Sequence, residues 1–166
     1  MTTALVGGLL GLFGTALGAT LTTWTARQTA ERSERRAQEE DRRQEYRSAV
    51  IRFATALLEY RLAAMGYWRA RQGELKEQEA AEREVYRKRA TAWNAFYELE
   101  LSTSSEITQL ARSAIDNAHS IQSQDTEDGM SHYSYQARQD LAAMVASARA
   151  AQPGAIPGME AVLSGG

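Results

Sequence analysis

Residues 46–68 read YRSAVIRFATALLEYRLAAMGYW, and this stretch decides the fold. Its apolar side chains recur every three or four residues, at Tyr46, Val50, Phe53, Leu57, Tyr60, Ala64 and Tyr67. That spacing places them on one face of an α-helix, whereas a half-buried strand would alternate every second residue. The stretch therefore predicts an amphipathic helix whose apolar face packs against other elements.

The same period returns three times on the C-terminal side of this helix. The later apolar stripes cover residues 85–99, 107–121 and 133–148. Both prolines of the 166-residue chain come at position 153 or later, so no obligatory helix breaker interrupts these stripes. We therefore predict an all-α protein, with an antiparallel three- or four-helix bundle over residues 46–151. Four aromatic residues are expected in its core or at its edge: Trp68, Trp93, Phe96 and Tyr97.

Local signals set the expected helix ends. A turn near Gly73 should end the first helix of the bundle. Thr103 and Glu106 fit a capping box, which predicts a helix start at that point. Residues 122–131, QSQDTEDGMS, are expected to form a polar loop, and residues 152–166 a flexible tail.

The N-terminal end of the chain has a different composition. Residues 1–26 carry no charged side chain, and residues 3–24 read TALVGGLLGLFGTALGATLTTW. A helix of that length spans roughly 33 Å, which matches the hydrocarbon core of a bilayer. This predicts a transmembrane helix over residues 3–25. A cleavable signal peptide is the alternative, with Ala16–Gly18 as a cleavage site, but no basic residue precedes the apolar run.

Small residues in the predicted span follow a helical period. Gly7, Gly11, Gly14 and Gly18 alternate spacings of four and three, which puts them on one helix face. Such a face lets membrane helices approach closely, so we expect it to form a homo-oligomeric contact. The competing interpretation is that glycine is merely common in membrane helices. Trp24 lies where an interfacial aromatic residue is expected.

Basic residues predict the orientation of this helix. None precedes the span, whereas Arg27 and Arg32 are the first of six arginines that follow it closely. The positive-inside rule therefore places the N-terminus outside and the bundle in the cytoplasm, with the chain anchored in the cytoplasmic (inner) membrane as a single-pass protein. Residues 26–45 are predicted to form a charged helical stalk, in which Arg27 and Arg32 reach the lipid headgroups.

The residues needed for catalysis are scarce. The chain has no cysteine, which excludes thiolate chemistry, and it has only two histidines. Di-iron bundles need two Glu-x-x-His motifs, and this chain offers only Asp116-x-x-His119, while His132 falls in the predicted polar loop. We therefore assign no catalytic, metal or cofactor-binding residue and expect the protein not to be an enzyme. The formal charge of −2 argues against a nucleic-acid partner.

The order of features resembles the short KilB-type proteins of actinomycete conjugative plasmids, which are linked to plasmid transfer and spread. Three passages carry the resemblance: ALVGGLLGLFGTALGATLTTW at residues 4–24, TARQTAERSERRAQEEDRRQEYRSAV at residues 25–50, and RATAWNAFYELEL at residues 89–101. The resemblance implies a membrane-associated accessory protein that acts through protein–protein contacts and has no catalytic motif.

Together these patterns predict a membrane-anchored, oligomeric helical scaffold. Its expected partners are further copies of the same chain, the lipid bilayer and an unidentified protein. The alternative function is an oligomeric pore built from the glycine-striped helix. A pore lumen needs a polar stripe, and the span supplies only a few threonine hydroxyls, so dry helix packing fits better.

Overall fold

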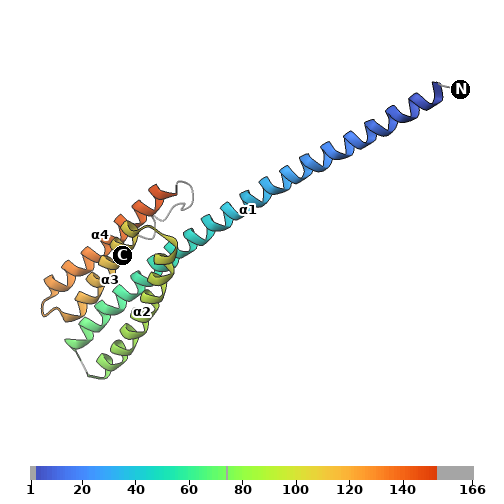
Figure 1. The fold of residues 1–166 in the computed structure, drawn as a ribbon. Coiled ribbons are helices and arrows are strands. Elements are labelled where there is room, and N and C mark those ends of the chain that lie inside the picture. Colours follow the sequence, from blue (N-terminus) through green and yellow to red (C-terminus); the bar gives the residue numbers. More distant parts are fainter. Residues whose placement is uncertain (1–2, 74, 153–166) are drawn as a thin grey trace. The chain divides into compact units, whose positions relative to one another are not determined.

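The computed structural model describes residues 3–73 and 75–152, and the side chains of residues 34–73 and 78–152. Its helices are α1 (Thr3–Arg71), α2 (Leu75–Ser102), α3 (Ser105–Ser120), the short 3-10 helix η1 (Ile121–Ser123) and α4 (Glu127–Ala151). The chain divides into two compact units, Met1–Arg42 and Arg43–Gly166. The four α-helices of the second unit pack as a bundle (Figure 1), which confirms the all-α prediction.

Side-chain contacts show that α1 and α2 run antiparallel. Arg52 of α1 pairs with Glu98 of α2 at 2.9 Å, and Glu59, further along α1, pairs with Lys88, earlier in α2. The connection between the two helices is short, as the turn predicted near Gly73 requires, because α1 ends at Arg71 and α2 begins at Leu75.

The same helix α1 is also antiparallel to α4. The Tyr46 hydroxyl donates to the Ala148 carbonyl at 3.0 Å, and Arg61 donates to Ser134 at 2.7 Å. Helix α1 therefore has α2 and α4 as antiparallel neighbours, as expected for an up-and-down bundle.

The core lies where the helical stripes meet. Tyr60, Phe53, Phe96, Leu57 and Leu99 are the largest fully buried side chains. The predicted stripe of α1 is buried from Tyr46 to Ala64, but at its end Trp68 is buried while Tyr67 is only partly covered. Trp68 also donates from its indole nitrogen to the Gln124 carbonyl at 2.8 Å, which ties the end of α1 to the segment before α4.

The start of α3 differs from the capping box predicted at Thr103. Ser104 occupies the N-cap position, with extended backbone and no side-chain hydrogen bond to the helix. The Thr103 hydroxyl instead donates back to the Leu99 carbonyl at 2.8 Å, at the end of α2. Thr103 therefore caps the preceding helix, because its hydroxyl reaches a carbonyl in the last turn of α2, which also accepts from the Ser102 hydroxyl at 3.1 Å.

The polar loop predicted over residues 122–131 is shorter than expected. Helix α4 already begins at Glu127, after Thr126, whose hydroxyl accepts a hydrogen bond from the Gly129 amide at 3.1 Å. Glu127 and Asp128 lie in the first turn, where negative charge is favoured by the helix dipole. His132 consequently lies within α4 and not in a loop, so that expectation was wrong.

The predicted membrane segment lies largely outside the described residues. The side chains of Gly7, Gly11, Gly14, Gly18, Trp24, Arg27 and Arg32 are among those not described, as is the segment beyond residue 152. Within the part of the chain that the structure describes, no helix is both long enough and apolar enough to cross a membrane. The described side chains of the predicted stalk, residues 34–45, are all exposed.

Candidate interaction surface

Helix α2 presents apolar residues on two of its faces. The inner face is buried in the bundle and includes Val85, Phe96 and Leu99. On the outer side, Tyr97 is 54% exposed and Leu101 is 90% exposed. Helices at the surface of a globular domain usually have one apolar face, so the second face of α2 needs its own explanation.

The second face is a continuous stripe, which we call the outer stripe. It consists of Tyr86, Ala90, Trp93, Tyr97 and Leu101. Their spacings of four, three, four and four residues keep them on one side of a helix. Three of the six large apolar residues that are well exposed on the described surface belong to this stripe. Contiguous exposed apolar surface of this kind is typical of protein interaction sites.

Trp93 joins the outer stripe to the core. It is only partly buried and meets the buried Phe96 ring edge-on, with 5.4 Å between ring centroids. The guanidinium of Arg112, from α3, lies over the indole at 5.5 Å from the ring centroid. Of the four aromatic residues expected in the core or at its edge, Trp68 and Phe96 lie in the core and Trp93 lies at the edge. Tyr97 is more than half exposed.

Shallow grooves flank the outer stripe. A groove of about 400 Å³ follows the line between α1 and α2, with the small side chains Ala56 and Ala95 in its lining. A second groove, of about 470 Å³, lies between α2 and α3 and includes Phe96, Glu100 and Arg112. Both are surface depressions that widen the area in which a partner could contact α2.

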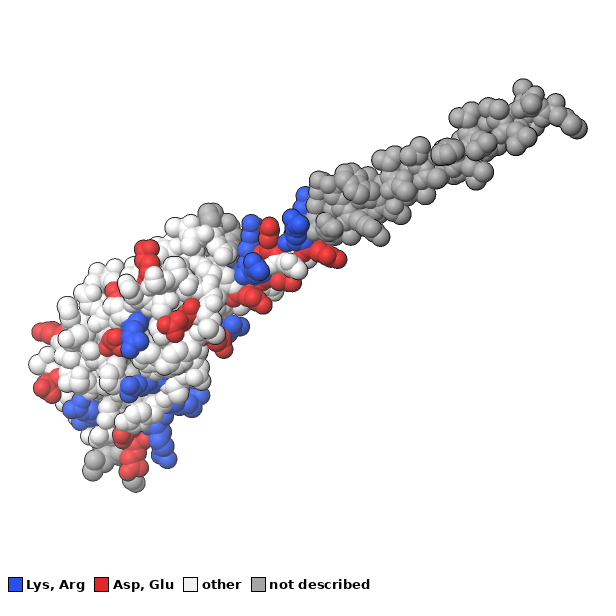
Figure 2. Space-filling view, in the orientation of Figure 1, with Lys and Arg blue, Asp and Glu red and all other residues white. Residues whose placement is uncertain are grey.

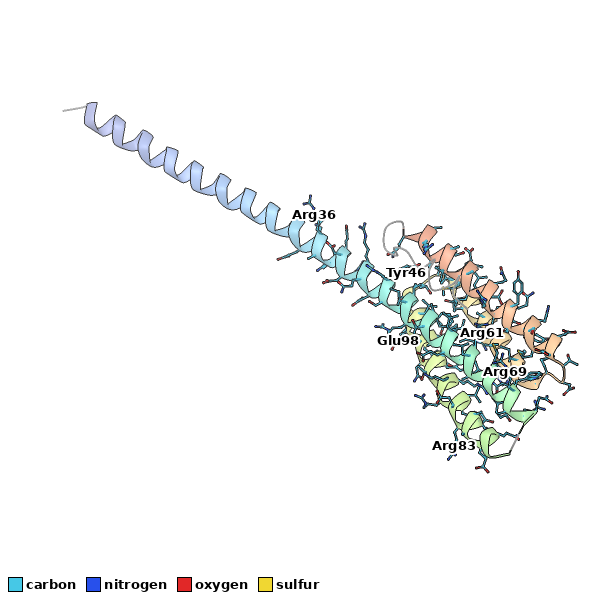
Figure 3. The ribbon with its side chains drawn as sticks, turned by 180° about the vertical axis from the view of Figure 1, so that it is seen from behind. Arg36, Tyr46, Arg61, Arg69, Arg83 and Glu98 are labelled. Atoms are coloured by element: carbon cyan, nitrogen blue, oxygen red, sulfur yellow. The ribbon has the colours of Figure 1, made fainter. Side chains whose placement is uncertain are left out.

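Charge is distributed unequally along α2. Residues 83–90 contain four basic side chains and one acidic one, while residues 94–102 contain two acidic side chains and no basic one. Figure 3 shows one labelled residue of each segment, Arg83 and Glu98, at different heights along α2. On the face drawn in Figure 2, acidic and basic side chains are interspersed with uncharged surface, without a broad field of one sign.

A cluster of hydrogen-bonded polar side chains lies where α1, α3 and η1 meet. The buried Tyr60 hydroxyl is 3.3 Å from Nδ1 of His119 and accepts a hydrogen bond from Gln122 at 2.8 Å. Burial raises the pKa of Tyr60 to about 12, so the phenol stays protonated at neutral pH and can donate to His119. Desolvation, together with the positive charge of Arg89, lowers the pKa of His119 and favours the neutral imidazole that accepts this bond.

This network links α1, α3 and η1 through side-chain hydrogen bonds. Among the side chains of residues 34–73 and 78–152, no group of three or more His, Cys, Asp or Glu residues is placed to hold a metal ion. The motif Asp116-x-x-His119 thus belongs to this network, with Asp116 contributing its charge.

The sequence analysis missed a buried cation in the bundle. Arg61 is 8% exposed, and its terminal nitrogen donates to the Ser134 hydroxyl at 2.7 Å. The Ser134 hydroxyl in turn donates to the Met65 sulfur at 3.3 Å. Desolvation lowers the pKa of Arg61, and the nearby positive charge of Arg138 lowers it further. Among the described side chains, no carboxylate forms an ion pair with Arg61.

A sequence signal for this pair existed. Arg61 lies four residues after Leu57 and three before Ala64, on the apolar period of α1. Ser134 has the same relation to Met130 and Ala137 in α4. Polar residues at core positions of two helices are expected to meet, because each needs a buried partner.

The fold and the surface define the class of protein. It is an antiparallel four-helix bundle whose most distinctive exposed feature, among the described residues, is an aromatic and aliphatic stripe on one helix. A family model described as KilB plasmid transfer protein matches residues 47–152, which cover the bundle from α1 to the end of α4. The chain belongs to this family, which implies a role in plasmid transfer. No curated protein and no solved structure matches it.

Proposed function

We propose that this chain is a membrane-anchored scaffold that supports plasmid transfer by holding other protein chains at the cytoplasmic membrane. Residues 3–25 form the anchor, the bundle lies in the cytoplasm, and no catalytic step is assigned to it. Copies associate in the bilayer through the face that carries Gly7, Gly11, Gly14 and Gly18.

The anchor is supported by the composition of the N-terminal segment. Residues 1–26 have no charged side chain, and basic residues begin at Arg27. This arrangement fits a span followed by a cytoplasmic stalk, because basic residues are retained on the cytoplasmic side. The exposed side chains of residues 34–45 fit a stalk that carries the bundle through solvent.

The observation that carries the scaffold function is the outer stripe of α2. Folding of the bundle does not require two tyrosines and a leucine to be exposed along one face of the same helix. In a member of a plasmid transfer family, such a surface is best explained as a contact for another chain of the transfer apparatus.

The experiment compares plasmid transfer by the full chain with transfer by the double variant Tyr97→Ser and Leu101→Ser. Both residues are more than half exposed, so the variant should fold as the parent does. We expect at least a tenfold loss of transfer between mating cells, with the same amount of protein in the membrane fraction.

The matched control is Tyr135→Ser in α4, which removes an aromatic ring of similar exposure, 58%, from a different helix. It should leave transfer unchanged. Normal transfer by the double variant would rule out the outer stripe as a functional contact. Recovery of the parent chain entirely in the soluble fraction would rule out the anchor.

A further inference from the structure

We propose that the outer stripe of α2 binds the outer stripe of a second copy of this chain, with the two α2 helices antiparallel. This inference rests on the proposed function, since it names the occupant of the same surface. It follows from two properties of α2, the sizes of the stripe residues and the signs of the charges beside them.

The sizes of the stripe residues complement each other only in the antiparallel arrangement. A two-fold axis that crosses the stripe between Trp93 and Asn94 places Tyr86 opposite Leu101 of the second copy. The same axis places the small side chain of Ala90 opposite the large ring of Tyr97. In a parallel pair, Tyr86 and Tyr97 would each meet their own equivalent, and Ala90 would face another alanine and leave a gap, whereas Trp93 lies near its equivalent in either arrangement.

The charges beside the stripe select the same arrangement. In the part of α2 that carries the stripe, residues 83–90 have four basic side chains against one acidic one, and residues 94–102 have two acidic side chains only. Of these charges, Lys88 and Glu98 also pair with Glu59 and Arg52 of α1. Antiparallel pairing places the basic segment of one helix beside the acidic segment of the other, whereas parallel pairing places like charges together. Exposed ion pairs within the chain, such as Arg87 with Glu84, cost little to exchange.

The interface so defined is small. The stripe covers about four helical turns, so the surface area that pairing buries is at the low end of the range for specific protein contacts. We therefore expect weak association, with a dissociation constant of roughly a micromolar or higher.

The proposed axis differs from that of helices packed side by side in a membrane. It reverses α2 and therefore also reverses the part of α1 that packs against it. Association of parallel membrane helices has its axis along those helices instead. The cysteines used below lie in α2 and α4, so their crosslinks report contacts between bundles and not contacts between membrane segments.

Single cysteines test the pairing, because the chain has none of its own. The full chain is purified in a mild detergent and treated with a short bis-maleimide crosslinker. Asn94→Cys lies beside the proposed axis and should give a covalent dimer. Arg83→Cys lies far from its equivalent, about 30 Å along the helix direction, and should not crosslink. Gln139→Cys, on the exposed surface of α4, measures the background from chance collisions.

A second set of variants ties the dimer to the stripe. Tyr97→Ser with Leu101→Ser, placed in the Asn94→Cys chain, should lower the dimer yield at least fivefold at equal protein concentration. Circular dichroism of each variant confirms that it has kept its helices. If Asn94→Cys gives no more covalent dimer than Gln139→Cys, the proposal is wrong. A high dimer yield from Arg83→Cys would also contradict it and would indicate parallel pairing.

The outcomes separate this inference from the proposed function. Loss of plasmid transfer in the double serine variant, without crosslinking of Asn94→Cys, would mean that the stripe works but binds a different protein. Crosslinking of Asn94→Cys without any effect of the stripe on transfer would support the pairing and contradict the proposed function.

Discussion

Helix α1 packs against both α4 and α2, and these two contacts differ in whether their polar side chains are buried or exposed. Against α4 it buries polar groups, with Arg61 on Ser134 and the Tyr46 hydroxyl on the Ala148 carbonyl. Against α2 it keeps them at the surface, where Arg52 and Glu98 form an ion pair with side chains 58% and 54% exposed.

The difference shows that polar side chains are shielded from water in the α1–α4 contact and reach water in the α1–α2 contact. Buried polar groups must be matched within the chain, because water cannot replace a missing partner. The α1–α4 contact has two such hydrogen bonds, from Tyr46 and from a terminal nitrogen of Arg61, while the buried Nε of Arg61 has no partner among the described residues. The α1–α2 contact combines a buried aromatic core with a solvated rim, and beyond that rim α2 carries the outer stripe.

The largest effect is expected from the core of the α1–α2 contact. Phe96 is 1% exposed and packs against Phe53, with 6.3 Å between ring centroids. Phe96→Ala should lower the free energy of unfolding by about 3–5 kcal/mol, because it removes the ring and leaves a cavity. Denaturant unfolding of the full chain, followed by circular dichroism, measures this. The neighbouring Tyr97→Ala, on the outer stripe, should cost less than about 1 kcal/mol. Equal losses would mean that α2 does not have an inner and an outer face.

An intermediate effect is expected at the buried cation of the α1–α4 contact. Ser134→Ala removes the hydroxyl that accepts from Arg61 and should cost about 1–3 kcal/mol, because a buried guanidinium loses its partner. Arg61→Met fills a similar volume without charge and should be nearly neutral or stabilising. The double variant should then be no less stable than Arg61→Met alone. If Ser134→Ala unfolds at the same denaturant concentration as the parent, this hydrogen bond does not contribute to stability.

The smallest effect is expected at the exposed ion pair. Arg52→Ala removes the partner of Glu98 and should cost only about 0.2–1 kcal/mol, because both side chains are more than half exposed. Added salt should reduce even that difference, since it screens surface charges. If Arg52→Ala lowers the free energy of unfolding as much as Ser134→Ala does, the exposed ion pair with α2 and the buried hydrogen bond with α4 contribute equally to stability. Unfolding at low and high ionic strength makes the comparison.

Candidate site residues were predictable to different degrees. Trp93 and Tyr97 stood out in the sequence as aromatic residues of one helix, but their period did not show which face would be covered. The buried pair Arg61 and Ser134 was detectable as two polar residues on apolar stripes, yet pairing them required knowing that α1 and α4 are neighbours. The link between Tyr60 and His119 likewise joins residues whose separation in sequence hides their contact.

The sequence by itself determined the class of fold and the approximate bounds of each helix in the bundle. Those properties depend on local periodicity, glycine and the absence of proline, all of which act over a few residues. It also determined the uncharged N-terminal segment, since charge composition can be read directly.

Only the tertiary structure decided which helices are neighbours, that Arg61 is buried, and that one of the two apolar faces of α2 remains exposed. Burial is a property of what packs against a residue. The two apolar faces of α2 differ in burial only because other helices pack against the inner face and not against the outer stripe.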